Sequence, residues 1–300
     1  MNRGRAQPPR DDGLVQPAAA RALWQCIEPY HAVTYFADES FAAYEEIGLR
    51  GFWRGYFAGR AAPLGAVGAG AVVATFYGFH PDFVARAIPA VWSIVTPAAA
   101  IEARARGTGR ALTRLFGDHR EEIGRAAHLA RQATDGCDPF ARPLFAANAD
   151  IPWPRDPHAA LWHACTLLRE HRGDGHVVAL YAADVDPCEA HVLRLAVAGA
   201  DRQSIAPYRG WSDDDWSAAA ERLTERGWLD DDRAVTPTGI EAHTAIEADT
   251  DRMAEGPTRA LGADGLAELL EIMRPLAAAL ESSGTIPFPN PIGVPAPGAD

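Results

Sequence analysis

The sequence predicts a mostly α-helical protein made of two tandem halves with long connecting helices and one small β element. Apolar residues recur at three- and four-residue spacing through most of its 300 residues, which is the period of an amphipathic helix. A segment with three prolines, residues 149–157, divides the chain into halves of similar length. A polar hairpin between two helical patterns lies near residue 230 and supplies the β element.

Both halves carry the helical pattern. In the first half we expect helices over residues 18–36, 39–48, 82–94, 98–116 and 118–134. In the second half we expect them over residues 157–171, 174–183, 187–198, 212–227, 237–255 and 263–282. Pro81 and Pro187 stand in first turns, and Ser212 precedes an acidic first turn. Gly173 and Gly175 are expected to break the helix between 171 and 174.

These patterns divide the chain into segments of different composition. The predicted segments are a disordered tail at 1–16, an N-terminal half at 17–148, a linker at 149–157, a C-terminal half at 158–284 and a Pro-rich tail at 285–300. Two stretches of similar length each begin with an Arg-Gly pair, at 54–55 and 172–173, and each end near a Trp. This internal similarity predicts a tandem repeat with insertions.

The composition excludes several classes of protein. A hydrophobic fraction of 48% with eight Trp indicates a globular chain, and the absence of Lys excludes lysine Schiff-base chemistry and a Walker P-loop. The four Cys are widely spaced, as in a reduced, cytoplasmic protein. We expect no signal peptide, because residues 1–13 have no apolar core. We also expect no membrane segment, because glycines and a proline interrupt the uncharged stretch 61–79. The sequence indicates no particular cofactor or oligomeric state.

The segment 212–240 carries the most specific structural signal. An amphipathic helix ends in RGWL at 226–229, an acidic turn follows at 230–233, and TPTG at 236–239 opens a long helix. This order resembles the MarR-like winged helix-turn-helix over about 174–255. More loosely, the chain resembles an actinobacterial family of tandem MarR-like proteins of unassigned function, on segments 50–65, 151–176 and 287–293. The resemblance implies two tandem winged-helix-like halves and a small β wing.

The charge of this segment differs from that of a DNA-binding helix-turn-helix. Residues 201–275 contain 17 acidic residues and eight Arg, and the whole chain carries a formal charge of −12. The predicted recognition helix starts with acidic residues 213–215, and the wing carries acidic residues 230–232. Six carboxylates facing phosphates would be repulsive. We therefore expect that DNA is not the partner.

Two segments of the first half hold candidate ligand-binding residues. On a helix, Gly51, Gly55 and Gly59 would form a stripe along one face, which would let the backbone of another segment come close. Arg side chains lie among aromatic side chains in the same segment. An Arg among aromatic rings can hold an anion or serve as a structural ion-pair partner. The candidates for ligand binding in this half are Trp53, Arg54, Arg60, His31 and Tyr35.

A dense polar cluster lies at 162–176. Its members are Trp162, His163, His171, Arg172, Asp174 and His176. We expect Trp162, His163 and Arg172 to bind ligand, and His171, Asp174 and His176 to act in acid–base catalysis. A metal site is a weaker reading because the His pairs lack the spacing of HExxH. Bracing of a helix–helix turn is the structural alternative.

Three functions remain open from the sequence. The leading hypothesis is a small-molecule protein that holds an aromatic or anionic metabolite in an Arg/His/Trp-lined cavity between the halves, with or without catalysis. The first alternative is a MarR-like transcription regulator. The second is a module that binds a protein partner through its acidic C-terminal face.

Overall fold

The structure is a computed structural model that describes residues 17–287 together with Asn290, Ile292 and Val294. The tail predicted at 1–16 lies outside the described residues, as does most of the Pro-rich tail beyond 287. None of the described helices is by itself long and apolar enough to cross a membrane, although two bent helix pairs pass the same test together.

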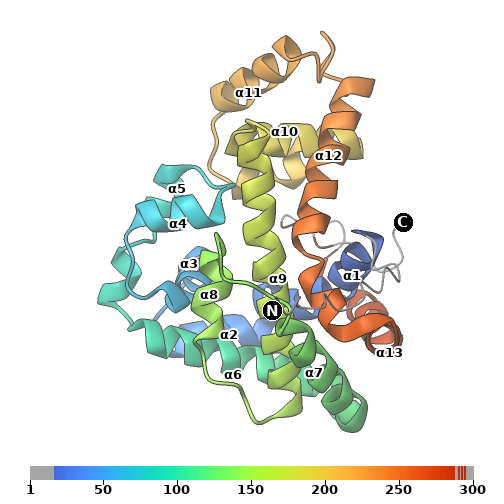
Figure 1. The fold of residues 1–300 in the computed structure, drawn as a ribbon. Helices are drawn as coiled ribbons and strands as arrows, with labels where there is room; N and C mark the ends of the chain where they lie inside the picture. The colour runs from blue at the N-terminus through green and yellow to red at the C-terminus, as the bar shows by residue number, and fades with distance from the viewer. Residues whose placement is uncertain (1–16, 288–289, 291, 293, 295–300) are drawn as a thin grey trace, which may run out of the picture.

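The prediction of a mostly helical protein is confirmed (Figure 1). The helices are α1 (Pro17–Phe36), α2 (Asp38–Glu46), α3 (Phe52–Ala61), α4 (Ala69–Phe76), α5 (Pro81–Ala85), α6 (Pro97–Phe116), α7 (Arg120–Thr134), α8 (Pro143–Ala149), α9 (Pro157–Ala182), α10 (Pro187–Ala198), α11 (Asp213–Glu225), α12 (Pro237–Met253) and α13 (Gly256–Ser282). Short 3-10 turns are η1 (Ala62–Leu64), η2 (Ala90–Ser93), η3 (Gly117–His119), η4 (Arg202–Ser204) and η5 (Ala206–Tyr208).

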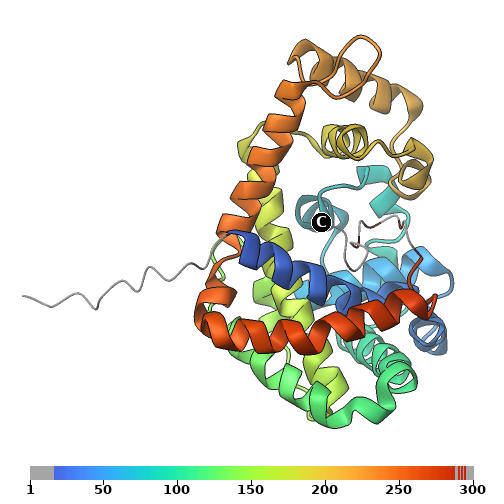
Figure 2. The same ribbon diagram turned by 90° about the vertical axis from the view of Figure 1, so that its right-hand side faces the viewer.

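The long helix α9 is the axis of the molecule. Its first half packs with α1, α7 and α13 around a core that includes Tyr30, Leu161 and Met273. Helices α1 and α13 lie side by side across this core, although they come from opposite ends of the chain (Figure 2). Helices α2 to α6 form a second core that is rich in aromatic rings. The two predicted halves are therefore interlocked through α1.

The C-terminal end of α9 carries a separate unit at one end of the molecule (Figure 1). This C-terminal unit, residues 187–236, contains α10, η4, η5, α11 and the hairpin that follows. Its core includes Leu193 and Trp216. Reciprocal capping boxes start both of its helices, at Asp186 with Glu189 and at Ser212 with Asp215. Such caps satisfy the free N–H groups of a helix start.

The predicted β wing is smaller than expected. Leu229 and Val235 form a single antiparallel bridge, and the described residues contain no strand. Backbone hydrogen bonds close the hairpin, from the Asp230 N–H to the carbonyl of Ala234 at 2.9 Å and from the Thr236 N–H to the carbonyl of Trp228 at 3.0 Å. The Asp230 carboxylate also accepts hydrogen bonds from the N–H groups of Asp232 and Ala234. The tandem repeat of two winged-helix-like halves stays a prediction.

Two glycine-based expectations turned out differently. The break predicted at Gly173 and Gly175 is wrong, since α9 runs through both residues. Gly175 is needed for a close approach instead: a Cβ there would lie 2.2 Å from Nη1 of Arg142. The stripe at Gly55 and Gly59 receives a side chain rather than a backbone, because a Cβ at Gly59 would lie 1.9 Å from the hydroxyl of Tyr44.

Other differences lie where helices are short. The helix expected at 82–94 is divided into α5 and η2. Helix α8, of seven residues, follows Arg142 and was not predicted. Segments this short contain too few turns to show a helical period.

Candidate functional site

The C-terminal unit is fastened to the loop between α4 and α5. The carbonyl oxygen of Gly78 accepts a hydrogen bond from Trp211 Nε1 at 3.1 Å and lies 2.8 Å from His191 Nε2. The His80 N–H donates to the carbonyl of Arg209 at 2.9 Å, and the Tyr77 hydroxyl donates to the carbonyl of Val185. These bonds join two parts of the chain more than 100 residues apart, so they fix where the unit sits.

A cavity of about 200 Å³ lies beneath this junction. Its walls come from both sides: α3, α4 and α9 on one, and α10 and the residue after η5 on the other. The aromatic side chains that line it are Tyr35, Tyr56, Phe76, Tyr77 and Phe79, and the guanidinium groups are those of Arg60, Arg169, Arg194 and Arg209. An adjoining cavity of about 280 Å³ shares Arg169, His176 and Arg194 with it.

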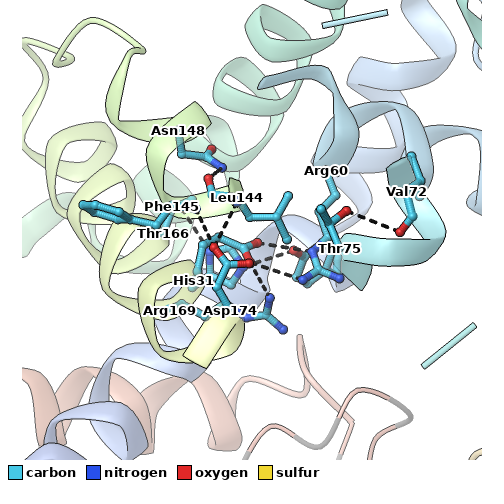
Figure 3. Close-up of polar contacts among 12 residues, drawn as sticks. His31, Arg60, Val72, Thr75, Leu144, Phe145, Asn148, Thr166, Arg169 and Asp174 are labelled. Carbon is cyan, nitrogen blue, oxygen red and sulfur yellow. Dashed lines mark hydrogen bonds and ion pairs between the residues drawn. The ribbon is translucent and has the colours of Figure 1, made fainter. Parts of the chain in front are cut away.

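One buried carboxylate neutralises two of these cations. Glu170 lies 3.2 Å from Nη2 of Arg60 and 2.9 Å from Nη1 of Arg169, with its side chain 2% exposed. Burial alone would raise the pKa of Glu170, but the two guanidinium groups hold it well below its usual range. Arg169 also bonds Glu28 at 3.3 Å. Figure 3 shows Arg60 of α3 and Arg169 of α9 directed to the same group of polar contacts.

The adjoining cavity has its own ion-pair network. Arg172 donates to Asp251 at 2.9 Å and to Glu247 at 3.2 Å, and its guanidinium lies 4.4 Å from the centre of the Trp24 ring. Arg21 pairs with the same two carboxylates. These pairs join α1, α9 and α12 and leave both cations compensated.

Arg194 differs from the other cations of the cavities. Within residues 17–287 and the three described positions beyond them, it has no hydrogen bond and no ion pair. Burial lowers its pKa, and the more distant charge of Glu247 opposes this only in part. Arg209 is buried over the Phe79 ring at 4.7 Å, and burial lowers its pKa to about 10. Arg194 is therefore a partly buried cation that no carboxylate of the described residues contacts directly.

Four of the residues predicted from the sequence line these cavities. Tyr35 and Arg60 line the first cavity, Arg172 lines the second, and His176 lines both. Nδ1 of His176 lies 3.0 Å from the hydroxyl of Thr250, and burial lowers the pKa of His176 to about 4. Its ring is therefore neutral at pH 7.

Two more predicted residues, His31 and Trp162, belong to a buried chain of contacts between α1 and α9. The Thr166 hydroxyl donates to the carbonyl of Trp162 at 2.9 Å and lies 3.0 Å from Nδ1 of His31. His31 Nδ1 is then the donor, and Nε2 accepts from the Tyr35 hydroxyl at 3.1 Å. Trp162 stacks on the His31 ring and donates to the His31 carbonyl at 3.1 Å. All the polar groups of His31 are thus used inside the core.

The remaining members of the 162–176 cluster point elsewhere. Asp174 accepts hydrogen bonds from the N–H groups of Leu144 and Phe145, at 2.9 and 3.0 Å, and so caps α8 (Figure 3). His171 packs edge-on against the Phe145 ring, and His163 packs against Trp153. Burial raises the pKa of Asp174 to about 7 and lowers that of His171 to about 4. His171 and Asp174 therefore face α8, on a different side from His176.

The two remaining candidates belong to α3. Trp53 packs edge-on against Phe83 at 4.9 Å in the aromatic core. Arg54 is exposed and does not line either cavity. Within the described part of the chain, no group of three or more His, Cys, Asp or Glu side chains is placed to hold a metal ion.

Sequence reasoning missed three lining residues of the C-terminal unit: His191, Arg194 and Arg209. A signal for two of them exists. Helix α10 is otherwise nearly apolar, and His191 and Arg194 stand three residues apart, which places them on one face. Charged groups on an apolar helix are either paired or functional.

The acidic start of α11 is partly engaged in the fold. Asp213 pairs with Arg202 of η4, Asp215 caps the N–H of Ser212, and Asp230 holds the hairpin. Three of the six carboxylates expected to repel DNA therefore serve local structure. Asp214 stays exposed, and Arg233 is exposed at the hairpin.

The fold defines a class of protein: a helical body that presents a compact helix–turn–helix unit at one end. The chain belongs to the helix-turn-helix family, whose family model matches residues 20–287. No curated protein and no solved structure matches it.

This membership corrects one expectation. The acidic composition predicted that DNA is not a partner, and that prediction is wrong, because the helix-turn-helix family points to a DNA-binding protein. Net charge describes the whole surface, whereas a helix-turn-helix touches DNA through a few side chains of one element. A count of charges could not show that Asp213 forms an ion pair, or that Asp215 and Asp230 accept local hydrogen bonds.

Proposed function

We propose that the protein is a DNA-binding transcription regulator that contacts DNA through its C-terminal unit, with α11 as the recognition helix. The supporting observation is the position of α11, at the end of the molecule opposite α6 and α7 (Figure 1). Its 13 residues span about 20 Å, and a helix about 10–12 Å across fits the major groove. The hairpin follows directly and would lie beside the phosphate backbone.

The charges of this face suggest how it would read DNA. An exposed carboxylate in the first turn, Asp214, can accept a hydrogen bond from the N4 amino group of cytosine, which the major groove displays. Arg233 of the hairpin can contact a phosphate. With few cations on this face, specificity would depend on base contacts more than on phosphate attraction.

Selection of bound duplexes from a random-sequence pool tests this proposal. We expect an enriched motif that contains a C·G pair, and Asp214→Ala should relax the preference at that pair by about 1–3 kcal/mol. Glu241→Ala, at an exposed position of α12, is the matched control and should leave the motif unchanged. Recovery of no motif by the wild-type protein would refute DNA recognition.

A second function, binding of a small aromatic or anionic molecule, is favoured by one observation. The cavity between the C-terminal unit and the body is lined by aromatic rings and guanidinium groups. Retention of a small molecule by protein purified from its own host, detected by native mass spectrometry, would support this function. Protein that is free of ligand and binds no probe anion would count against it.

A further inference from the structure

We propose that a cationic patch at the edge of the helical body forms a second DNA-contacting surface, which holds the phosphate backbone beside the site read by α11. This α3–α5 patch consists of Arg50, Arg54, Arg86 and Tyr208. The proposal rests on the DNA binding proposed above and deepens it. The C-terminal unit itself contains ten acidic residues and only six Arg, so phosphate contacts need another source.

The stretch of chain that forms most of the patch is nearly free of acidic residues. Residues 47–101 contain four Arg and a single acidic residue, Asp82, whereas the whole chain has 40 acidic residues and 28 Arg. One of the four, Arg60, is neutralised by Glu170 inside the molecule. The surface of this stretch therefore carries net positive charge in a protein whose formal charge is −12. Such a local field attracts a polyanion even where the whole molecule is acidic.

The three Arg side chains of the patch are exposed and have no counterion. Within the part of the chain that the structure describes, Arg50, Arg54 and Arg86 form no ion pair and no side-chain hydrogen bond. By contrast, Arg110 of the neighbouring helix α6 is also exposed but pairs with Glu46 at 2.8 Å. An unpaired guanidinium is available to a phosphate, whose oxygens its N–H groups match.

Ring contacts connect the members of the patch across three segments. The Arg86 guanidinium lies over the Phe83 ring at 5.3 Å, and Phe83 packs edge-on against Trp53 at 4.9 Å. Trp53 precedes Arg54 on α3, and its ring lies 6.5 Å from that of Tyr208 in η5. Tyr208 is 40% exposed, and its hydroxyl can donate to a phosphate oxygen. Because the Phe83 ring restrains Arg86, a phosphate contact there costs less side-chain entropy.

The patch adjoins the C-terminal unit on the side where α11 lies. Figure 1 shows α3, α5 and α11 on the same side of α9. The contact is close, since a Cβ at Gly210, three residues before α11, would lie 2.4 Å from Cβ of Phe83. DNA that flanks the α11 site would then run along this side of the body, with its phosphates against the patch. This position favours DNA over an acidic protein as the partner.

The salt dependence of DNA binding by the full chain tests the patch, with the duplex that the wild type selects from the random-sequence pool. The variant Arg54→Met/Arg86→Met should keep the selected motif but bind all sequences more weakly. The slope of log K against log salt should fall by about two, as expected for loss of two phosphate contacts. Hydroxyl-radical footprinting should show that protection is lost beside the motif and kept over it.

A matched control separates a local contact from a change in net charge. Arg155→Met/Arg274→Met removes the same charge at two exposed positions, one before α9 and one on α13. Neither residue forms an ion pair within the described part of the chain. This control should leave the slope and the footprint unchanged. Both double variants should keep a melting temperature close to that of the wild type, because no ion pair is lost.

The outcomes distinguish failure of the patch from failure of DNA recognition. An unchanged slope and footprint for Arg54→Met/Arg86→Met would overturn the patch and leave recognition by α11 in place. Altered self-association of this variant in sedimentation, with unchanged DNA binding, would assign the patch to a second copy of the chain and would also overturn the proposal. If the wild type selects no duplex, DNA recognition itself fails and the patch fails with it.

Discussion

Replacement of Glu170 by Gln is the perturbation whose effect the structure specifies best. The Glu170 side chain is 2% exposed and lies between the guanidinium groups of Arg60 and Arg169, which are 10% and 17% exposed. Gln keeps the shape of the side chain but removes its charge. Two cations would then stand buried beside each other with one fewer counterion, although Glu28 would still pair with Arg169.

The expected loss of stability is large. Removal of one partner from a buried ion pair costs about 3–5 kcal/mol, because the other charge stays desolvated. For a chain of this size, 1 kcal/mol corresponds to about 2–4 °C in melting temperature. Glu170→Gln should therefore lower the melting temperature by about 6–20 °C.

Thermal unfolding followed by circular dichroism measures this effect. Glu46→Gln is the matched control, because Glu46 also pairs with two Arg side chains, Arg106 and Arg110, but is 46% exposed. Solvent screens exposed pairs, so this control should change the melting temperature little. A loss below about 1 kcal/mol for Glu170→Gln would refute the view that Glu170 neutralises the two cations.

Two further predictions concern acid stability and the junction. Burial lowers the pKa of His163 and His171 to about 4, so the unfolded chain takes up protons more readily below pH 6.5. The free energy of unfolding, measured with urea, should therefore fall between pH 6.5 and pH 4 by up to about 3 kcal/mol for each His. A variant that carries both His163→Gln and His171→Gln should lose less stability over this pH range. An equal loss of stability in the variant and the wild type would contradict this prediction. Gly78→Ala should lower stability by about 1–3 kcal/mol, because its Cβ would lie 2.8 Å from His191 Nε2. Gly70→Ala, whose Cβ meets nothing within 4 Å, is its control, and equal urea stability of the two variants would exclude a tight junction.

The helical class of the fold could be predicted because amphipathic helices leave a local period in the sequence. Helices α6, α7 and α10 agree with the predicted ranges to within two residues at each end. The continuity of α9 could not be predicted in this way. Gly175 reads locally as a helix breaker, whereas its role is to admit Arg142 from a distant segment.

The candidate site was predictable only in part, for a related reason. The sequence singled out Arg60 and His176, which line the cavity, because they stand in segments dense in polar and aromatic residues. It did not single out Arg194, since what distinguishes Arg194 is the lack of a partner in the described fold. Likewise, a charge count could not show that Asp213 is paired with Arg202. Pairing depends on tertiary contacts, which spacing along the chain does not encode.

The salt dependence of binding to the selected duplex tests the central claim most directly. Arg233→Met should weaken binding to all sequences alike and reduce the slope of log K against log salt by about one, as expected for loss of one phosphate contact. Arg252→Met, an exposed position of α12 outside the C-terminal unit, should leave the slope unchanged. An unchanged affinity and slope for Arg233→Met would contradict the proposal that the hairpin and α11 face the DNA.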